Sequence, residues 1–192
     1  MSADGAAFPR ARRDFSRRSD ETEWLDAAHP DPVELAHVLR DLARFNGAML
    51  GRLMVLSWLR RAIAAVPPGR TPSLVDVGCG YGDLLRSIRH WADRRGIAIA
   101  LCGVDANPAT IRIARAATQE HKQIDFIVAD ALRFRPTAPI DLIVSSLLAH
   151  HLTDSAIVAL LRWMEGTARH GWLVCDLQRH KLPYHAIRLA GT

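Results

Sequence analysis

The chain has 192 residues, of which 49% are hydrophobic and 23% charged, with a formal net charge of +5 at pH 7. This length and composition suit one domain with a sizeable core, and no apolar run is long enough to cross a bilayer. Because the first residues lack the apolar segment of a signal peptide, we expect a cytoplasmic protein. The three cysteines, Cys79, Cys102 and Cys175, include no Cys-x-x-Cys spacing, which favours reduced, packed thiols over disulfides or a zinc site.

Basic residues cluster near the amino terminus. The cluster consists of Arg10, Arg12, Arg13, Arg17 and Arg18. Such a cluster can contact nucleic acid, but most clusters of this kind are solvated tails. We therefore expect residues 1–19 to form a mobile tail and expect no nucleic-acid partner. An RNA substrate is kept as an alternative.

A helix is predicted to begin after Asp31. This aspartate is a favourable N-cap, Pro32 occupies the first helical position, and Glu34 follows three residues after the cap. Apolar residues then recur at intervals of three or four as far as Leu56, and Pro67-Pro68-Gly69 ends the pattern.

The helical segment has two weak points, at Asn46-Gly47 and at Gly51, so it is expected to be one long helix or two. Its role also has two interpretations. Residues 20–70 either pack on a sheet or, together with Trp24-Leu25, form a lid that covers a ligand and shapes its pocket.

From Leu74 onward, predicted strands and helices alternate, and this alternation requires a parallel sheet with right-handed crossovers. The strands are expected at residues 74–78, 98–104, 124–128, 140–146 and 171–176, and the helices at 82–95, 108–119 and 154–168. Ligands of such sheets bind at the carboxyl ends of the strands. The residues that follow each strand are therefore the candidate functional residues.

The run VDVGCGYGD at residues 75–83 is the most informative motif, because its glycines stand at alternate positions directly after a strand. Glycine lets the backbone turn sharply and leaves no side chain between the loop and a ligand. The next two strands end at Asp105 and Asp130, at the same edge of the sheet as Asp76. A carboxylate at Asp105 can accept both hydroxyls of a ribose, so the pattern predicts a nucleotide-like cofactor.

The motifs VDVGCGYGD, GVDANP and ADAL, followed by IDLIVSSLLAHHL, resemble in order and spacing those of class I S-adenosylmethionine-dependent methyltransferases. The resemblance runs from about Ser73 to about Asp176, and the stretch SDETEWLD before it is similar to that of small bacterial enzymes of the UbiE-like type. It implies a Rossmann-like α/β fold, with an open parallel sheet of order 3-2-1-4-5, helices on both faces and an N-terminal helical segment. It also implies S-adenosyl-L-methionine as the cofactor, bound by Asp76, Gly78, Cys79, Gly80, Gly82, Asp105, Ala106, Asp130, Ala131 and Ser145.

The glycine loop favours this cofactor over a dinucleotide. A pyrophosphate needs G-x-G-x-x-G and a helix N-terminus, whereas this loop is G-x-G-x-G and Asp83 begins the helix. The charge of Asp83 would repel an anion, while an ammonium and a sulfonium suit Asp76 and the carbonyl of Gly78. An NAD-dependent oxidoreductase and a cofactor-binding protein without catalysis are kept as alternatives.

The residues after the fourth strand, Leu147–Leu152, lie where the acceptor should meet the methyl group. Methyl transfer is a direct displacement, which needs alignment and exclusion of water and, for a phenol or enol, one base. His151 is the first candidate for this base and His150 the second, and the alternative is that both only line the pocket. No Asp or Glu lies between Ser145 and His151, so we expect no metal.

Apolar residues surround these histidines and predict a small aromatic or lipidic acceptor, methylated at oxygen. They are Leu147, Leu148, Ala149 and Leu152, with Trp24 and Tyr184 from elsewhere in the chain. Enzymes that methylate base amines resemble one another in an Asn-Pro-Pro-Tyr type motif, in place of which this chain has Ser145-Ser146-Leu147-Leu148. Methylation of a base amine is therefore disfavoured.

The resemblance implies two further strands after the fifth, and the residues from Gln178 to Thr192 are too few to build them. Lys181–Leu189 is predicted to be one short helix or an irregular arm. We therefore expect residues 71–192 to be a C-terminally truncated methyltransferase domain whose fifth strand leaves an apolar edge. A homodimer that covers this edge is the alternative.

Overall fold

The structure is a computed structural model that describes residues 31–48, 51–118 and 123–176, all within one unit, Ala28–Leu177. The predictions for the arginine-rich tail, for Trp24-Leu25 and for Lys181–Leu189 lie outside the described residues. Among the residues that are described, no helix is long and apolar enough to cross a membrane.

The amino-terminal helical segment divides into two helices, α1 (Pro32–Ala48) and α2 (Gly51–Ile63). The predicted cap is present, because Oδ1 of Asp31 accepts hydrogen bonds from the backbone nitrogens of Val33 at 2.9 Å and Glu34 at 3.1 Å. Of the two arrangements that the weak points allowed, the structure has two helices.

Five parallel strands form the sheet: β1 (Ser73–Val77), β2 (Ala100–Asp105), β3 (Ile124–Val128), β4 (Ile140–Ser146) and β5 (Ala168–Cys175). Their order is β3-β2-β1-β4-β5, which confirms the predicted topology. In this register Asp76 of β1 pairs with Gly103 of β2 on one side and with Val144 of β4 on the other. Parallel pairing brings the carboxyl ends of all five strands to one edge.

The strand bounds differ most from the prediction at β5, which begins at Ala168 and not at residue 171. The strand continues through Gly171, whose φ is 145°, and the pairing with β4 shifts register between Ile140 and Leu142. A bulge of this kind accommodates a glycine inside a strand, so a strand that extends before Gly171 is not evident from periodicity. The other bounds agree within two residues, the usual uncertainty of element ends.

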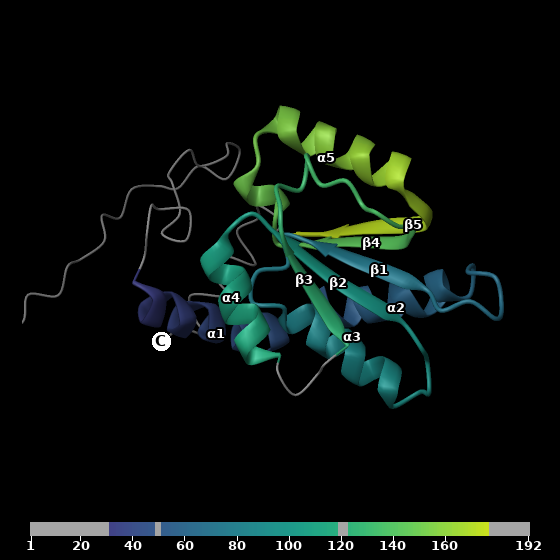
Figure 1. The fold of residues 1–192 in the computed structure, drawn as a ribbon, viewed down its shortest axis with the longest axis horizontal. Coiled ribbons are helices and arrows are strands. Elements are labelled where there is room, and N and C mark those ends of the chain that lie inside the picture. Colours follow the sequence, from purple (N-terminus) through teal and green to yellow (C-terminus); the bar gives the residue numbers. More distant parts are fainter. Residues whose placement is uncertain (1–30, 49–50, 119–122, 177–192) are drawn as a thin grey trace, which may run out of the picture. The chain divides into compact units, whose positions relative to one another are not determined.

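Helices cover both faces of the sheet, as Figure 1 shows. Helix α5 (Asp154–Thr167) lies on one face, and α2, α3 (Asp83–Asp93) and α4 (Pro108–Ala117) lie on the other. The apolar residues divide accordingly into two clusters, so that Val144 of β4 belongs to the cluster with α2 and α3, while Ile143 belongs to the cluster with α5. This division follows from the alternation of side chains along a strand.

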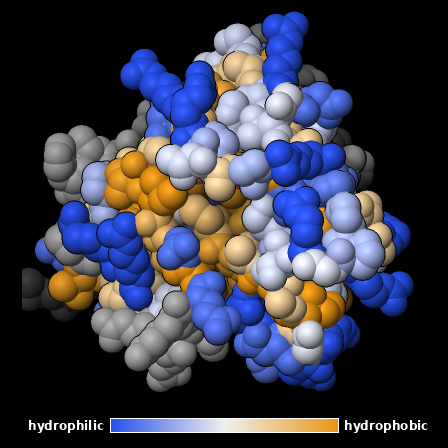
Figure 2. Space-filling view, turned by 45° about the vertical axis from the view of Figure 1, so that its right-hand side comes forward, coloured by the Kyte–Doolittle hydropathy of each residue, from blue (hydrophilic) through white to orange (hydrophobic). Residues whose placement is uncertain are grey.

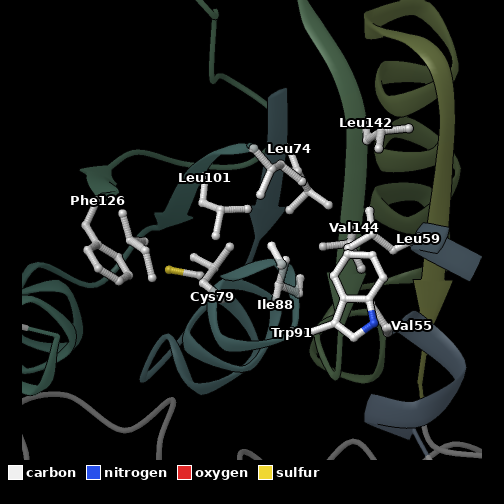
Figure 3. Close-up of a cluster of buried hydrophobic side chains, with 14 of the residues drawn as sticks. Val55, Leu59, Leu74, Cys79, Ile88, Trp91, Leu101, Phe126, Leu142 and Val144 are labelled. Atoms are coloured by element: carbon white, nitrogen blue, oxygen red, sulfur yellow. The ribbon is translucent and has the colours of Figure 1, made fainter. Parts of the chain in front are cut away.

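The larger cluster fills the space between the sheet and the helices α2, α3 and α4. Figure 3 shows Trp91 of α3 and Val55 of α2 in this cluster, together with Leu142 and Val144 of β4. Leu59 of α2 is completely buried there. Helix α2 therefore packs on the sheet, as the first interpretation of the amino-terminal segment predicts, and the lid interpretation stays a prediction.

Hydrophobic side chains also reach the surface at several places, which Figure 2 shows as orange atoms among blue ones. The large exposed ones among the described residues are Val33, Leu42, Leu53, Met54, Ile127, Val128 and Val158. Within the described ranges, no strand pairs with the outer edge of β5.

The packing of α2 can be tested with two leucines on the same helix. Leu59→Ala should lower the free energy of unfolding by about 2–5 kcal/mol, because it removes buried methyl groups and leaves a cavity. Leu53→Ala is the matched control; Leu53 is 60% exposed, so its loss should cost less than about 0.5 kcal/mol. Urea denaturation followed by circular dichroism measures both, and equal losses would contradict this packing.

Candidate functional site

The glycine loop leaves the carboxyl end of β1 in a sharp turn. Gly78, Gly80 and Gly82 have positive φ angles of 74°, 49° and 73°, in the left-handed region that favours glycine. The backbone nitrogens of Gly78 and Cys79 both donate hydrogen bonds to the carbonyl of Val104, at 2.8 and 3.0 Å. The turn is thereby fastened to the end of β2.

Two of these glycines are also required by packing. A Cβ atom at Gly78 would lie 2.9 Å from the side chain of Leu148, and one at Gly82 would lie 2.8 Å from the ring of Phe126. A Cβ atom at Gly80 would have no neighbour within 4 Å. Gly80 is therefore the position in the loop where another molecule can come closest to the backbone.

Asp105 links the glycine loop to the turn after β2. Its Oδ2 accepts a hydrogen bond from the nitrogen of Gly80 at 3.0 Å, and its Oδ1 accepts one from the nitrogen of Asn107 at 2.9 Å. Burial raises the pKa of Asp105, while these two hydrogen bonds and the charge of His151 lower it. The carboxylate is thus held against the loop from the neighbouring strand.

Asp76 has the most unfavourable electrostatic environment of the site. Its side chain is buried, and its Oδ1 has no hydrogen-bond partner in the described part of the chain. Burial raises the pKa of Asp76 well above its usual range, and the charges of Asp83 and Asp105 raise it further. A buried polar atom of this kind needs a hydrogen-bond donor, from an ordered water or a ligand, and a nearby cation would stabilise its charge.

The negative charge around Asp76 is only partly compensated. Burial raises the pKa of Asp83 as well, although a backbone hydrogen bond and the positive charges of Arg86 and Arg52 oppose that shift. Ser145, on the neighbouring strand β4, is completely buried, and its hydroxyl is also unpaired within the described residues. The glycine loop is therefore suited to a cationic ligand and unsuited to an anionic one.

The turn after β3 contributes Asp130 and Ala131 to the same edge. Oδ1 of Asp130 accepts a hydrogen bond from the nitrogen of Leu132 at 2.7 Å, and the side chain is exposed. The nitrogen of Ala129 donates to the carbonyl of Asp105 at 3.0 Å. The structure thus brings Asp76, Asp105 and Asp130 to one edge, as the sequence predicts, with exposed Ala106 beside Asp105.

The chain after β4 makes a tight corner that carries both histidines. Leu147 has a positive φ of 58°, and its nitrogen donates a hydrogen bond to the carbonyl of Cys175 at 2.9 Å. A short 3-10 helix, η2 (Ala149–His151), follows. The imidazole rings of His150 and His151 lie with their centroids 4.1 Å apart, so the two candidates for a base are neighbours.

Asp176, which the sequence analysis missed, contacts this corner from the end of β5. Its Oδ2 accepts hydrogen bonds from the backbone nitrogens of Ala149 at 2.6 Å and His150 at 3.3 Å. Its Oδ1 lies 2.6 Å from Nδ1 of His150. The signal that could have found it is its position directly after a strand, the same position that singled out Asp105 and Asp130.

The opposite edge of the sheet carries a shallow depression lined by Thr71, Arg89, Gln123 and Asp125, among others. The guanidinium of Arg89 donates there to Asp93 and to Gln123, both at 3.2 Å, and to the carbonyl of Ile99. These contacts join α3 to the strands, so Arg89 has a structural role. The candidate functional site is therefore the other edge of the sheet, which carries the glycine loop.

No group of three or more His, Cys, Asp or Glu side chains that could hold a metal ion occurs in the ranges that the structure describes. The three cysteines are free thiols, and burial raises the pKa of Cys102 to about 11.

Comparison with known proteins identifies the family of this chain. The methyltransferase domain family matches residues 74–171, more than half of the chain. The trans-aconitate 2-methyltransferase of Azoarcus sp. (strain BH72) is 29% identical over 125 residues, which cover 65% of this chain and 40% of that protein. The chain therefore spans less than half the length of this relative.

Solved structures share the fold at low sequence identity. The PH0226 protein from Pyrococcus horikoshii OT3 aligns with a TM-score of 0.53 and 18% identity, over 74% of this chain and 59% of that one. Human N-acetylserotonin methyltransferase in complex with SAM aligns with a TM-score of 0.55 and 20% identity, over 75% of this chain and 38% of that one. The plantazolicin methyltransferase BpumL in complex with SAH aligns with a TM-score of 0.52 and 19% identity, over 78% of this chain and 55% of that one.

The raised pKa of Asp76 predicts that this residue destabilises the ligand-free protein. The folded state binds the Asp76 proton more tightly than the unfolded state, so the free energy of unfolding falls as pH rises through the raised pKa. Asp76→Asn should therefore raise the free energy of unfolding by at least about 1 kcal/mol at pH 8, and by less at pH 5.

The exposed Asp130 provides the matched control, because Asp130→Asn should change the free energy of unfolding by less than about 0.5 kcal/mol at either pH. Thermal unfolding at pH 5 and pH 8 measures both variants. An Asp76→Asn protein that is less stable than the unmodified chain at pH 8 would contradict the account of the buried charge.

Proposed function

We propose a specific reaction for this chain, which belongs to the class I S-adenosylmethionine-dependent methyltransferases. The chain transfers the methyl group of S-adenosylmethionine to an oxygen of a small aromatic or lipidic acceptor, and the transfer needs no metal. The observation that carries the cofactor end of the proposal is the unpaired, buried Oδ1 of Asp76 among the charges of Asp83 and Asp105. A ligand with an ammonium and a sulfonium would relieve this repulsion. A pyrophosphate would increase it.

Asp105 is proposed to bind the ribose hydroxyls. Each of its oxygens accepts one backbone hydrogen bond, from Gly80 and from Asn107, and an ionised carboxylate has about four acceptor sites. Two sites therefore remain for two hydroxyls. Asp130 is proposed to accept from the adenine amino group, and Gly78, with Asp76, to surround the methionine end.

The remaining proposed cofactor contacts are backbone contacts. They are proposed for Cys79, Gly80, Gly82, Ala106 and Ala131, and Ser145 is included as an indirect contact. The open space at Gly80 supports this part of the proposal, because another molecule can approach the loop there. The complete burial of Ser145 limits it to an indirect contact through the strand.

When bound, S-adenosylmethionine supplies a methyl carbon that is already activated by a sulfonium, so the chain mainly has to position the acceptor and exclude water. Leu147, Leu148 and Leu152 are half-buried at the corner after β4 and offer an apolar surface for this purpose. His151 is proposed to supply the base for the acceptor hydroxyl, and His150, on the same corner, is the second candidate.

Three further points belong to the proposal. We propose that the reaction takes place in the cytoplasm and that the acceptor is a small molecule and not a nucleic acid. A second copy of the chain that covers the outer edge of β5 is kept as an alternative.

Cofactor binding is tested first by Asp105→Ala. The substitution removes a carboxylate that accepts paired hydroxyls, at a cost of about 1.5–3 kcal/mol, so the affinity for S-adenosylhomocysteine should fall at least about tenfold in calorimetry. Asp125→Ala, at the opposite edge of the sheet, is the control and should bind normally. Unchanged affinity of the Asp105 variant, or tighter binding of a nicotinamide dinucleotide, would overturn the assignment.

Activity is tested with S-adenosylmethionine labelled in the methyl group and a panel of phenols, enols and lipidic alcohols. Transfer should occur to a hydroxyl and should be unaffected by EDTA, since the described site offers no cluster of metal ligands. Loss of activity with EDTA would refute the metal-independent mechanism. Binding without transfer to any acceptor would instead indicate a cofactor-binding protein without catalysis.

A further inference from the structure

We propose that Leu147 determines which acceptors the site takes, because its side chain forms a wall of the acceptor pocket and is held there by a strained backbone. The inference rests on the proposed methyl transfer to a small aromatic or lipidic acceptor. It gives a reason for a large apolar residue at a position where the backbone favours glycine.

The backbone of Leu147 has an unfavourable conformation. Its φ of 58° lies in the left-handed region, and every other positive φ in the described ranges belongs to a glycine. For a residue with a Cβ atom, this conformation brings Cβ close to the following carbonyl oxygen. Leucine also lacks the short polar side chain that lets Asn and Asp adopt this region. The surrounding structure must therefore compensate the strain.

Two contacts hold the corner on either side of this strained position. The nitrogen of Leu147 donates a hydrogen bond to the carbonyl of Cys175 at 2.9 Å. The next side chain, Leu148, packs over the glycine loop, since a Cβ atom at Gly78 would lie 2.9 Å from it. The left-handed conformation lets the chain leave β4 and still make both contacts.

Packing in the core does not explain why this residue is a leucine. Leu148 and Leu152, on the same corner, pack against the apolar cluster that includes residues of α5. Leu147 is half-buried, yet it belongs to neither apolar cluster of the described residues. Glycine would remove the strain at no cost to either cluster, so the side chain itself has a use at this edge of the sheet.

The position of Leu147 suits contact with an acceptor. It directly follows β4, at the edge that carries the glycine loop, and it precedes the short helix with both candidate bases. A branched aliphatic side chain gives a flat ring an apolar contact and no hydrogen bond. Because the backbone is held on both sides, the side chain also limits the size of the ring. The pocket therefore prefers an acceptor with one aromatic ring to a bulkier one.

The strain is measured first, without any ligand, from Leu147→Gly and Leu147→Ala. Both variants remove the side chain beyond Cβ, and only glycine adopts the left-handed region without cost. In thermal unfolding, Leu147→Gly should melt about 2–4 °C above Leu147→Ala. An equal or lower melting temperature of Leu147→Gly would overturn the proposal.

Val158 provides the matched control for this pair of substitutions. It is 46% exposed and lies inside helix α5, where the backbone is right-handed. Val158→Gly should therefore melt about 2–4 °C below Val158→Ala. Opposite orders of the glycine and alanine variants at the two positions would support the strain at Leu147, and the same order at both would contradict it.

Acceptor selectivity is measured with phenol and 2-naphthol, which share the reacting hydroxyl and differ by one ring. Leu147→Ala should raise the ratio of kcat/KM for 2-naphthol to kcat/KM for phenol at least about 10-fold, because it opens space for the second ring. Leu147→Met keeps the apolar volume and should preserve the ratio, as should Val158→Ala. An equal loss for both acceptors in Leu147→Ala would indicate a structural role alone and would overturn the proposal.

Contact with the acceptor is measured without turnover, from methyl spectra of the full chain labelled at leucine and saturated with S-adenosylhomocysteine. The signals of Leu147 are assigned from Leu147→Ala. Added phenol should shift them through the ring current of its aromatic ring. The signals of Leu101, at the opposite edge of the sheet, should stay in place. Unchanged signals of Leu147 would refute the contact.

The outcomes distinguish this proposal from the proposed function. If the unmodified chain methylates no acceptor, the proposed function fails, and the melting temperatures and the titration still decide whether a strained Leu147 lines a ligand site. If phenols are methylated with the same selectivity by Leu147→Ala and by the unmodified chain, methyl transfer stands and the role of Leu147 is refuted.

Discussion

The hydrogen bond from the nitrogen of Gly80 to the carboxylate of Asp105 joins the two halves of the site. This hydrogen bond crosses from the loop after β1 to the end of β2 and holds the carboxylate against the loop. The loop cannot accept a larger side chain at Gly78 or Gly82, because a Cβ atom there would clash with a neighbouring side chain. The nitrogens of Gly78 and Cys79 bond to the same strand end. The shape of the loop therefore depends on how β1 and β2 are paired.

This arrangement concentrates negative charge in a place that is poorly solvated. Asp76, Asp83 and Asp105 all have pKa values raised by burial, and Asp76 is also affected by the other two. Such repulsion costs stability in the ligand-free protein, yet it selects a cation over a phosphate when a ligand binds. The same carboxylates thus lower the stability of the ligand-free protein and favour a cationic ligand, and such a trade-off between stability and function is common at binding sites.

The corner after β4 shows a second consequence of strand pairing. The register of β4 and β5 brings Leu147 to Cys175 and so sets Asp176 beside His150. The corner therefore holds two adjacent imidazole rings, and Asp176 lies beside the first of them.

Local patterns in the sequence determined the strand and helix order, the glycine loop and the positions of Asp76, Asp105 and Asp130, because residues that follow parallel strands share one edge. They could not determine the pairing of His150 with Asp176, which are 26 residues apart, or the start of β5 at Ala168. Both depend on the register of β4 and β5 and on a bulge near Gly171. A register is decided by tertiary packing of whole strands, and no local periodicity records it.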